Sequence, residues 1–217
     1  MLVQTIAGPL AGDRVTIDVE IGPGAALELV GNAATLAYPS AEPAHHEVRV
    51  RVGAGGRFAW APEPLILATD CDLEASVELE LAAGAAAFTR ELVVLGRHGE
   101  KPGSYRSSLR CELDGTPLLH DAVEIDDGGS AASSAAVLAG AKAFASLALL
   151  GVETQERLDA EELTLAGPGT VLRALAPDAA SLRKRLAPAE STYLGALAAH
   201  GPKRSASGSR VARGSCG

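Results

Sequence analysis

Three copies of one short pattern decide how this chain folds: VTIDVEIGPGAALEL from Val15, VRVRVGAGGRFAW from Val48 and VELELAAGAAAF from Val77. Each copy starts with strict alternation of apolar and polar residues. A turn rich in Gly and Ala follows, and then a second run with an apolar bias. Alternation with a period of two is typical of a strand with one buried face, because successive side chains point to opposite sides. Each copy therefore predicts two strands joined by a tight turn.

The spacing of the copies predicts how they are assembled. The turn glycines Gly24, Gly55 and Gly84 lie 31 and 29 residues apart. A period near thirty residues indicates one supersecondary unit used several times, which cannot bury its apolar face alone. We interpret each unit as a β-hairpin and expect the hairpins to stack like a β-solenoid, with their turns along one edge.

The polar faces of the first strands alternate in charge from copy to copy. Side by side in sequence order, the copies would place a basic strand between two acidic ones, and such cross-strand pairs favour one register. The alternative is that these side chains are merely solvated. They are Asp18 and Glu20 in the first copy, Arg49 and Arg51 in the second, and Glu78 and Glu80 in the third.

Composition narrows the classes of protein. The 217 residues are 47% hydrophobic but only 3% aromatic, so we expect a core of Val, Leu, Ile and Ala. A formal charge of −8 argues against nucleic acid or an anionic membrane as a partner. No apolar run reaches the roughly 20 residues of a membrane span, and the N-terminus does not resemble a signal peptide. Cys71, Cys111 and Cys216 are odd in number and lack zinc-ligand spacing, which fits a reducing cytoplasm.

After the three copies, the sequence predicts one more hairpin and then a mixture of strands and helices. Residues 109–125 read as a further hairpin turning at Asp114-Gly115. Residues 135–152 favour either a helix or a helix followed by a strand from about Phe144. A last hairpin is expected around Gly167-Pro168-Gly169, and a helix capped by Asp178 is expected to run through Leu186. We predict an all-β-dominated fold with about two helices in its C-terminal third, one domain over 1–200, and a disordered basic tail over 201–217.

Motifs for catalysis are missing from the sequence. It contains no G-x-S-x-G, P-loop, H-E-x-x-H or C-x-x-C motif. The pair His45-His46 suggests a metal site, but neighbours on a strand face opposite sides, so a permanent metal is not expected. Cys71 as a nucleophile would need a histidine beside it, and a buried structural thiol is the simpler interpretation.

Six carboxylates stand at strand ends or within apolar runs, away from the alternating polar faces. A buried carboxylate is costly unless it is paired. Glu91 is the clearest, and it could form an ion pair with Arg90 or Arg97. The functional alternative is a polar lining for an internal path along which cations are passed. The six are Glu63, Asp70, Glu91, Glu100, Asp121 and Glu124.

The order of several motifs resembles the urease accessory protein family UreD, also called UreH. The stretches PLAGDRVTIDVEIGPGAALEL, NAATLAY, GGRFAWAPEPLILA, RELVVLGRHGE and DGTPLLHD follow one another as in that family. The matching residues are Gly12-Asp13, Ala34-Thr35 with Tyr38, Trp60 with Pro62 and Ile66, Glu91 with Leu95-Gly96-Arg97, and Asp114-Gly115 with Pro117-Leu118-Leu119.

The resemblance implies a function. Members of the family are non-enzymatic chaperones of urease maturation with an all-β fold. It implies that this chain binds apo-urease on one side and the accessory proteins UreF and UreG on the other, and that it passes nickel transiently, with no permanent cofactor. Two alternatives remain open at this stage: a β-solenoid binding module without a metal role, and a small hydrolase using Cys71 or the pair Glu63 and Asp70.

Overall fold

The computed structural model describes residues 10–126, 138–153 and 161–201. Its elements, in chain order, are β1 (Arg14–Ile21), β2 (Ala26–Val30), β3 (Thr35–Ala37), β4 (Ala44–Val52), β5 (Arg57–Ala61), β6 (Leu65–Leu67), β7 (Asp72–Leu81), β8 (Ala86–Leu95), β9 (Ser104–Leu113), β10 (Thr116–Ile125), β11 (Ala143–Leu150), β12 (Glu162–Thr164), β13 (Gly169–Ala176) and α2 (Ala179–Ala199).

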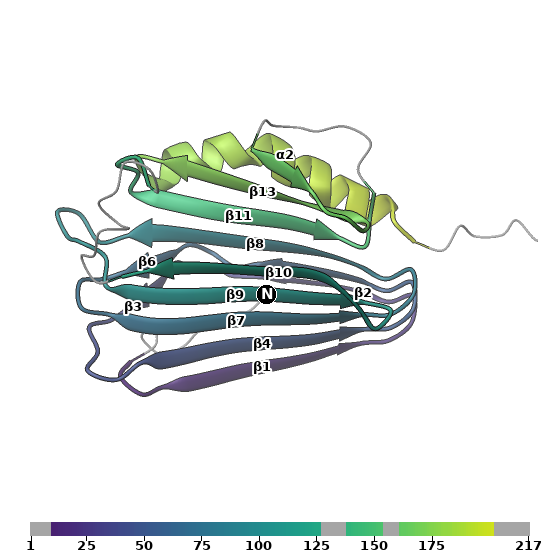
Figure 1. Cartoon of the computed structure of the whole chain (residues 1–217), viewed down its shortest axis with the longest axis horizontal. Coiled ribbons are helices and arrows are strands. Elements are labelled where there is room, and N and C mark those ends of the chain that lie inside the picture. Colours follow the sequence, from purple (N-terminus) through teal and green to yellow (C-terminus); the bar gives the residue numbers. More distant parts are fainter. Residues whose placement is uncertain (1–9, 127–137, 154–160, 202–217) are drawn as a thin grey trace, which may run out of the picture.

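The strands form two sheets stacked face to face as a β-solenoid-like coil (Figure 1). One sheet has five strands in the order β1-β4-β7-β9-β10. The other has eight and includes the path β12-β13-β11-β8-β5-β2. The repeated copies are adjacent and parallel in both sheets, because β1, β4 and β7 pair in order, as do β2, β5 and β8. The predicted β-rich fold class is confirmed.

The interpretation of each copy as a hairpin is wrong. The two strands of a copy do not pair with each other. The first lies in the five-stranded sheet and the second in the eight-stranded sheet, so the Gly-rich turn crosses between the sheets. Each apolar face is then buried against the opposite sheet. The later hairpin at Asp114-Gly115 is confirmed, since β9 and β10 pair antiparallel around a turn in which both residues have positive φ.

The turns line up along one edge as expected. Gly24 donates its backbone N–H to the carbonyl of Ala54 at 2.9 Å, and Gly55 donates to that of Ala83 at 3.1 Å. Gly24, Gly55 and Gly84 have φ values of +68°, +64° and +66°, the left-handed region in which a side chain is strained. The same turn is therefore repeated at the same height in successive coils.

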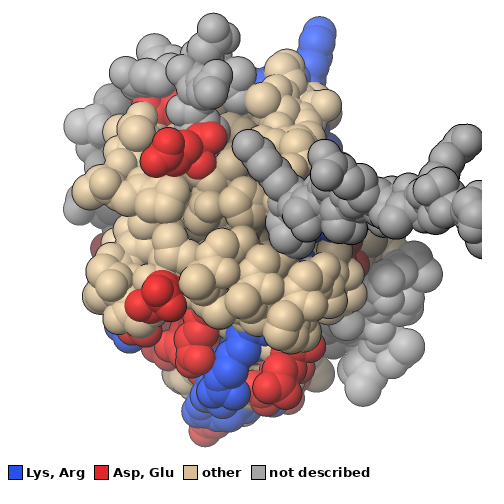
Figure 2. All heavy atoms as spheres, turned by 90° about the vertical axis from the view of Figure 1, so that its right-hand side faces the viewer, with Lys and Arg blue, Asp and Glu red and all other residues tan. Residues whose placement is uncertain are grey.

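The alternating charges of the copies also meet as predicted. Asp18, Arg49 and Glu78 are aligned across β1, β4 and β7, and Glu20, Arg51 and Glu80 form the next row. The Arg51 Nε lies 3.0 Å from Glu80 Oε2, and an Arg49 nitrogen lies 4.0 Å from Asp18. Figure 2 faces the turn end of the coil and shows charged side chains gathered over its lower part, with the remaining surface mostly uncharged.

The C-terminal third adds three strands and a helix to the eight-stranded sheet. Residues 143–150 are strand β11, and β12 and β13 form the hairpin expected around Gly167-Pro168-Gly169. Helix α2 is capped by the Asp178 carboxylate, which accepts the Ser181 N–H at 2.7 Å. It continues to Ala199 because apolar side chains keep helical spacing beyond Pro188. It is the one helix among the described residues. Of the tail predicted at 201–217, residues 202–217 lie outside them.

Two apolar layers hold the described parts together. One fills the space between the two sheets, and the other lies between α2 and the outer face of the eight-stranded sheet. In the second layer the Phe88 and Tyr193 rings meet edge to face with centroids 6.5 Å apart. The Tyr193 hydroxyl donates to the buried Glu162 carboxylate at 2.6 Å.

Among the described residues, no helix combines the length and the apolar character needed to cross a membrane.

Candidate functional site

A layer of polar side chains crosses the otherwise apolar space between the two sheets. On six strands, a polar residue stands in the inward-facing row between apolar residues of the two core clusters, and on β8 the buried Thr89 also stands in that row. We call the six residues other than Thr89, together with the hydroxyl of Tyr105, the polar layer. They are His46 on β4, Glu91 on β8, Ser107 on β9, Asp121 on β10, Ser146 on β11 and Arg173 on β13.

Strand register places three members of the polar layer in one row. Ser146 is paired with Glu91 on one side and with Arg173 on the other. Residues paired across neighbouring strands share a face, so all three side chains point toward the five-stranded sheet. Their neighbours along the strands face α2 instead. The alternation of β8, β11 and β13 therefore sends one side chain of each into the middle of the core.

Glu91 is held from the opposite sheet. The buried Tyr105 hydroxyl donates a hydrogen bond to Glu91 Oε1 at 2.6 Å. Burial raises the pKa of the Glu91 carboxyl. The hydrogen bonds from Tyr105 and Ser107 and the charge of Arg173 oppose this rise, whereas the nearby Asp121 adds to it. Burial also raises the pKa of Tyr105 well above its usual value, and the charge of Glu91 adds to that shift.

An ion pair between Asp121 and Arg173 joins the two sheets at the side of the polar layer. The Asp121 side chain is only 19% exposed, while that of Arg173 is 47% exposed. Asp121 and Arg173 therefore stand between solvent and Glu91.

Ser146 is the member of the polar layer whose side-chain bonding is incomplete. Its hydroxyl oxygen is buried and has no hydrogen-bond partner within the described part of the chain. A buried hydroxyl without a partner costs about 1–3 kcal/mol. The Ser146 hydroxyl, between Glu91 and Arg173, is therefore suited to bind a water molecule.

The other four predicted carboxylates lie elsewhere. Asp70 is exposed in a turn with φ +59°, and Glu124 is exposed on the outer face of β10. Glu100 binds the Arg97 guanidinium at 2.6 Å, and this contact lowers the pKa of Glu100. Glu63 lies on the side of the eight-stranded sheet that faces α2. Of the six candidates, only Glu91 and Asp121 share the polar layer.

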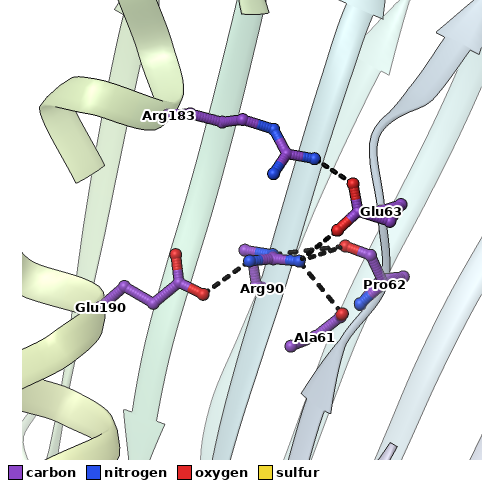
Figure 3. A network of polar contacts seen from close by, with 6 residues as sticks. All are labelled: Ala61, Pro62, Glu63, Arg90, Arg183 and Glu190. Atoms are coloured by element: carbon purple, nitrogen blue, oxygen red, sulfur yellow. Dashed lines mark hydrogen bonds and ion pairs between the residues drawn. The ribbon is translucent and has the colours of Figure 1, made fainter. Parts of the chain in front are cut away.

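The proposed ion pair of Glu91 with Arg90 or Arg97 is wrong. Arg90 follows the opposite face of β8, as alternation requires, and points toward α2 (Figure 3). There it lies 2.6 Å from the Glu190 carboxylate and 3.6 Å from that of Glu63, and it donates to the carbonyls of Ala61 and Pro62. Glu63 also binds Arg183 of α2.

The remaining sequence candidates do not form a site. His45 faces outward and lies 3.1 Å from Glu74, while His46 faces inward and burial lowers its pKa. Cys71 is buried, and Glu63 and Asp70 stand in separate surroundings, so the structure does not support the hydrolase alternative. Within the described ranges no group of three or more His, Cys, Asp and Glu could hold a metal ion.

Sequence reasoning missed Ser146, Arg173, Tyr105 and Ser107. A usable signal was present for two of them. Ser146 is the one polar residue of AFASLALL, and Arg173 is the one charge in GTVLRALA. A single polar residue inside an otherwise largely buried strand indicates a partner across the core.

The raised pKa of Glu91 predicts a pH-dependent effect of Glu91→Gln. The usual value is 4.5, so the folded protein keeps this proton at pH values where the unfolded chain has lost it. The contribution to stability is full below pH 4.5 and declines as pH rises toward the folded pKa. Glutamine does not titrate. The melting temperature of Glu91→Gln relative to wild type should therefore rise with pH, and a constant difference in thermal melts from pH 4 to 8 would contradict the raised pKa.

Comparison with known proteins identifies the family. The family model described as "UreD urease accessory protein" matches residues 1–210. The chain belongs to the UreD family. The UreD chain is 42% identical to urease accessory protein UreD 1 of Saccharopolyspora erythraea, over 66% of this chain and 57% of that protein. It is 35% identical to UreD of a Parafrankia species, over 91% and 76% of the two chains. It is 36% identical to UreD of Streptomyces coelicolor, over 86% and 78%.

The resemblance inferred from the motifs is thus confirmed, and with it membership in a family of urease accessory proteins. The alignment to the Saccharopolyspora relative spans less than two thirds of that protein. The motif residue Glu91 is the one that this UreD chain places in the polar layer, beside Tyr105.

Proposed function

We propose that this UreD chain is a non-enzymatic chaperone of urease maturation that scaffolds the accessory complex and offers nickel a passage into apo-urease. Family membership supports the role in maturation. The observation that carries the passage is the polar layer, in which Glu91 and Asp121 bring two carboxylates into the space between two apolar sheets.

The chemistry of the polar layer suits transient binding. A path must bind an ion well enough to admit it and weakly enough to release it. Glu91 and Asp121 supply oxygen ligands, and the hydroxyls of Ser107 and Ser146 can replace part of a hydration shell. Arg173 competes with a cation for Asp121, so the ion would have to displace that contact to enter. These groups fit a hydrated divalent ion that moves on, and they do not resemble a chelating His/Cys site.

The partners proposed are apo-urease subunits and the accessory proteins UreF and UreG, in the cytoplasm. The solenoid supports this role because its two sheets, its turn edge and its outer helix offer several separate surfaces on one scaffold (Figure 1). Nickel in this account is cargo, so no permanent cofactor is required.

The test is Glu91→Gln, which keeps the side-chain shape and removes the charge. The variant is co-expressed with the urease subunits and the other accessory proteins, and the purified urease is assayed for nickel content and for activity. We expect the complex to form in a pull-down, and we expect both nickel and activity to fall several-fold. Glu124→Gln, an exposed carboxylate on the outer face of β10, is the matched control.

Two outcomes separate the parts of the proposal. If urease matured with Glu91→Gln contains as much nickel as urease matured with wild type, and the complex is intact, the proposed nickel passage is wrong. The chain would then be a scaffold without a metal role. Failure of the wild-type chain to bind any urease or accessory subunit would remove the scaffold.

A further inference from the structure

The polar layer contains a cation of its own. Of the residues that form the layer, Arg173 carries the one permanent positive charge, and Asp121 is the one carboxylate that it binds within the described part of the chain. Arg90, on the other face of the same sheet, differs in both respects. Its side chain is only 12% exposed, and it binds two carboxylates and two backbone carbonyls. Arg90 is therefore fixed by its surroundings, whereas Arg173 is held at one point.

The Arg173 side chain reaches from the polar layer to solvent. It is 47% exposed, although its backbone lies between the buried Leu172 and Ala174 of β13. The long apolar stem of an arginine lets the charged head move into water while the backbone stays in place. An ion pair this exposed adds little net stability, so the guanidinium can leave at low cost. The Asp121 carboxylate is only 19% exposed and needs another cation in exchange.

The space beside Arg173 contains a group that lacks a partner. The Ser146 hydroxyl is 7% exposed and makes no hydrogen bond within the described residues. Strand pairing places Ser146 between Arg173 and Glu91. Because neighbouring strands lie about 4.8 Å apart, the Cα atoms of Arg173 and Glu91 are separated by roughly 10 Å. Two carboxylates and a free hydroxyl thus converge on the region that the guanidinium borders, and oxygen ligands of this kind suit a divalent ion that keeps some of its water.

We propose that Arg173 is a tethered cation, which an entering nickel ion displaces from Asp121 and which then returns to expel the ion. In the empty state, the ion pair of Arg173 with Asp121 closes this side of the polar layer. In the loaded state, the guanidinium lies in solvent, and the ion is bound by Asp121, Glu91 and Ser146. A divalent ion balances two carboxylates, whereas one guanidinium balances one.

The tether determines how long the ion stays. Because Arg173 remains attached to β13, its guanidinium competes for Asp121 again whenever the ion shifts. This competition keeps the affinity low and the release fast, as a passage requires. The inference rests on the proposed nickel passage and states what prevents that passage from retaining its ion.

The first test measures the binding of Ni²⁺ to the purified full chain by equilibrium dialysis against nickel chloride. Arg173→Met removes the competing charge and keeps most of the stem, so Ni²⁺ should bind about tenfold more tightly. Arg173→Lys restores a positive charge and should recover most of the wild-type behaviour. Adding Asp121→Asn to Arg173→Met should remove the gain. Arg97→Met is the matched control, because Arg97 is 50% exposed and binds the single carboxylate of Glu100 away from the layer. It should leave the affinity unchanged.

The second test separates binding from release. In the co-expression assay, urease matured with Arg173→Met should contain several-fold less nickel than urease matured with wild type, although the variant binds Ni²⁺ more tightly. A folding defect would lower both quantities. An affinity of Arg173→Met at or below that of wild type, a gain that persists with Asp121→Asn, or unchanged nickel in urease would each overturn the tethered cation.

Glu91→Gln in the same assay shows which proposal has failed. If Glu91→Gln lowers the nickel content of urease while Arg173→Met changes neither affinity nor delivery, the passage stands and the tethered cation is wrong. If Glu91→Gln leaves the nickel content unchanged, the passage itself is wrong, and the tethered cation that rests on it is overturned with it.

Discussion

Replacing Arg90 by Met should lower the free energy of unfolding by about 3 kcal/mol. The Arg90 side chain is only 12% exposed and joins β8 to α2 through Glu190 and to the corner after β5 through Glu63 (Figure 3). Its guanidinium also satisfies the carbonyls of Ala61 and Pro62. Methionine keeps most of the apolar stem but leaves two partly buried carboxylates without their shared cation.

Arg183→Met is the matched control, because Arg183 binds the same Glu63 but is 45% exposed. An exposed ion pair contributes about 0–1 kcal/mol, so this variant should remain close to wild type. Urea unfolding followed by circular dichroism measures both. Equal losses for the two variants would show that the number of ion pairs to Glu63, and not the burial of Arg90, decides the stability of this contact.

Gly103→Ala should also destabilise the protein by about 3 kcal/mol, for a steric reason. A Cβ at Gly103 would stand 2.3 Å from the carbonyl oxygen of Cys71 and 2.4 Å from its nitrogen. These are backbone atoms, fixed because Gly103 donates to the Ala68 carbonyl at 3.0 Å and Ser104 donates to that of Cys71 at 2.7 Å. The turn before β9 would have to separate from the turn before β7.

The same substitution at Gly195 should stabilise the protein, in contrast to Gly103→Ala. Gly195 lies within α2, and a Cβ there would meet no atom within 4 Å. Alanine is favoured over glycine in a helix by about 1 kcal/mol, so this variant should melt at a higher temperature than wild type. If Gly103→Ala were as stable as wild type, the two turns could separate freely and the coils would not be closely stacked.

The alternation of the copies predicted the strands, their faces and their order, because these depend on neighbouring residues. It did not distinguish a hairpin from a turn that crosses between sheets. Both contain two strands and a Gly-rich turn, and the difference lies in the partner of each strand. That partner is a copy about thirty residues away, so only the stacked structure reveals it.

In the candidate site, too, features set by neighbouring residues could be predicted and contacts between distant strands could not. The apolar neighbours of Glu91 in the sequence correctly predicted that its carboxylate is partly buried. Strand alternation places Arg90 on the opposite face of β8. Its surroundings could not be predicted. Ser146 and Arg173 come from strands that follow 55 and 82 residues later in the chain. Tyr105 reaches Glu91 from the opposite sheet, and no local pattern encodes a distance between sheets.

The position of α2 has a consequence for synthesis on the ribosome. The outer apolar face of the eight-stranded sheet is covered by the last element of the described chain, so it stays open to water while β8, β11 and β13 are already translated. The nascent chain therefore presents an uncovered apolar surface until residue 199 has left the exit tunnel. At about 5–20 residues per second, the interval from the end of β8 to the end of α2 lasts about 5–20 seconds. During this interval the uncovered apolar face is exposed to association with other chains.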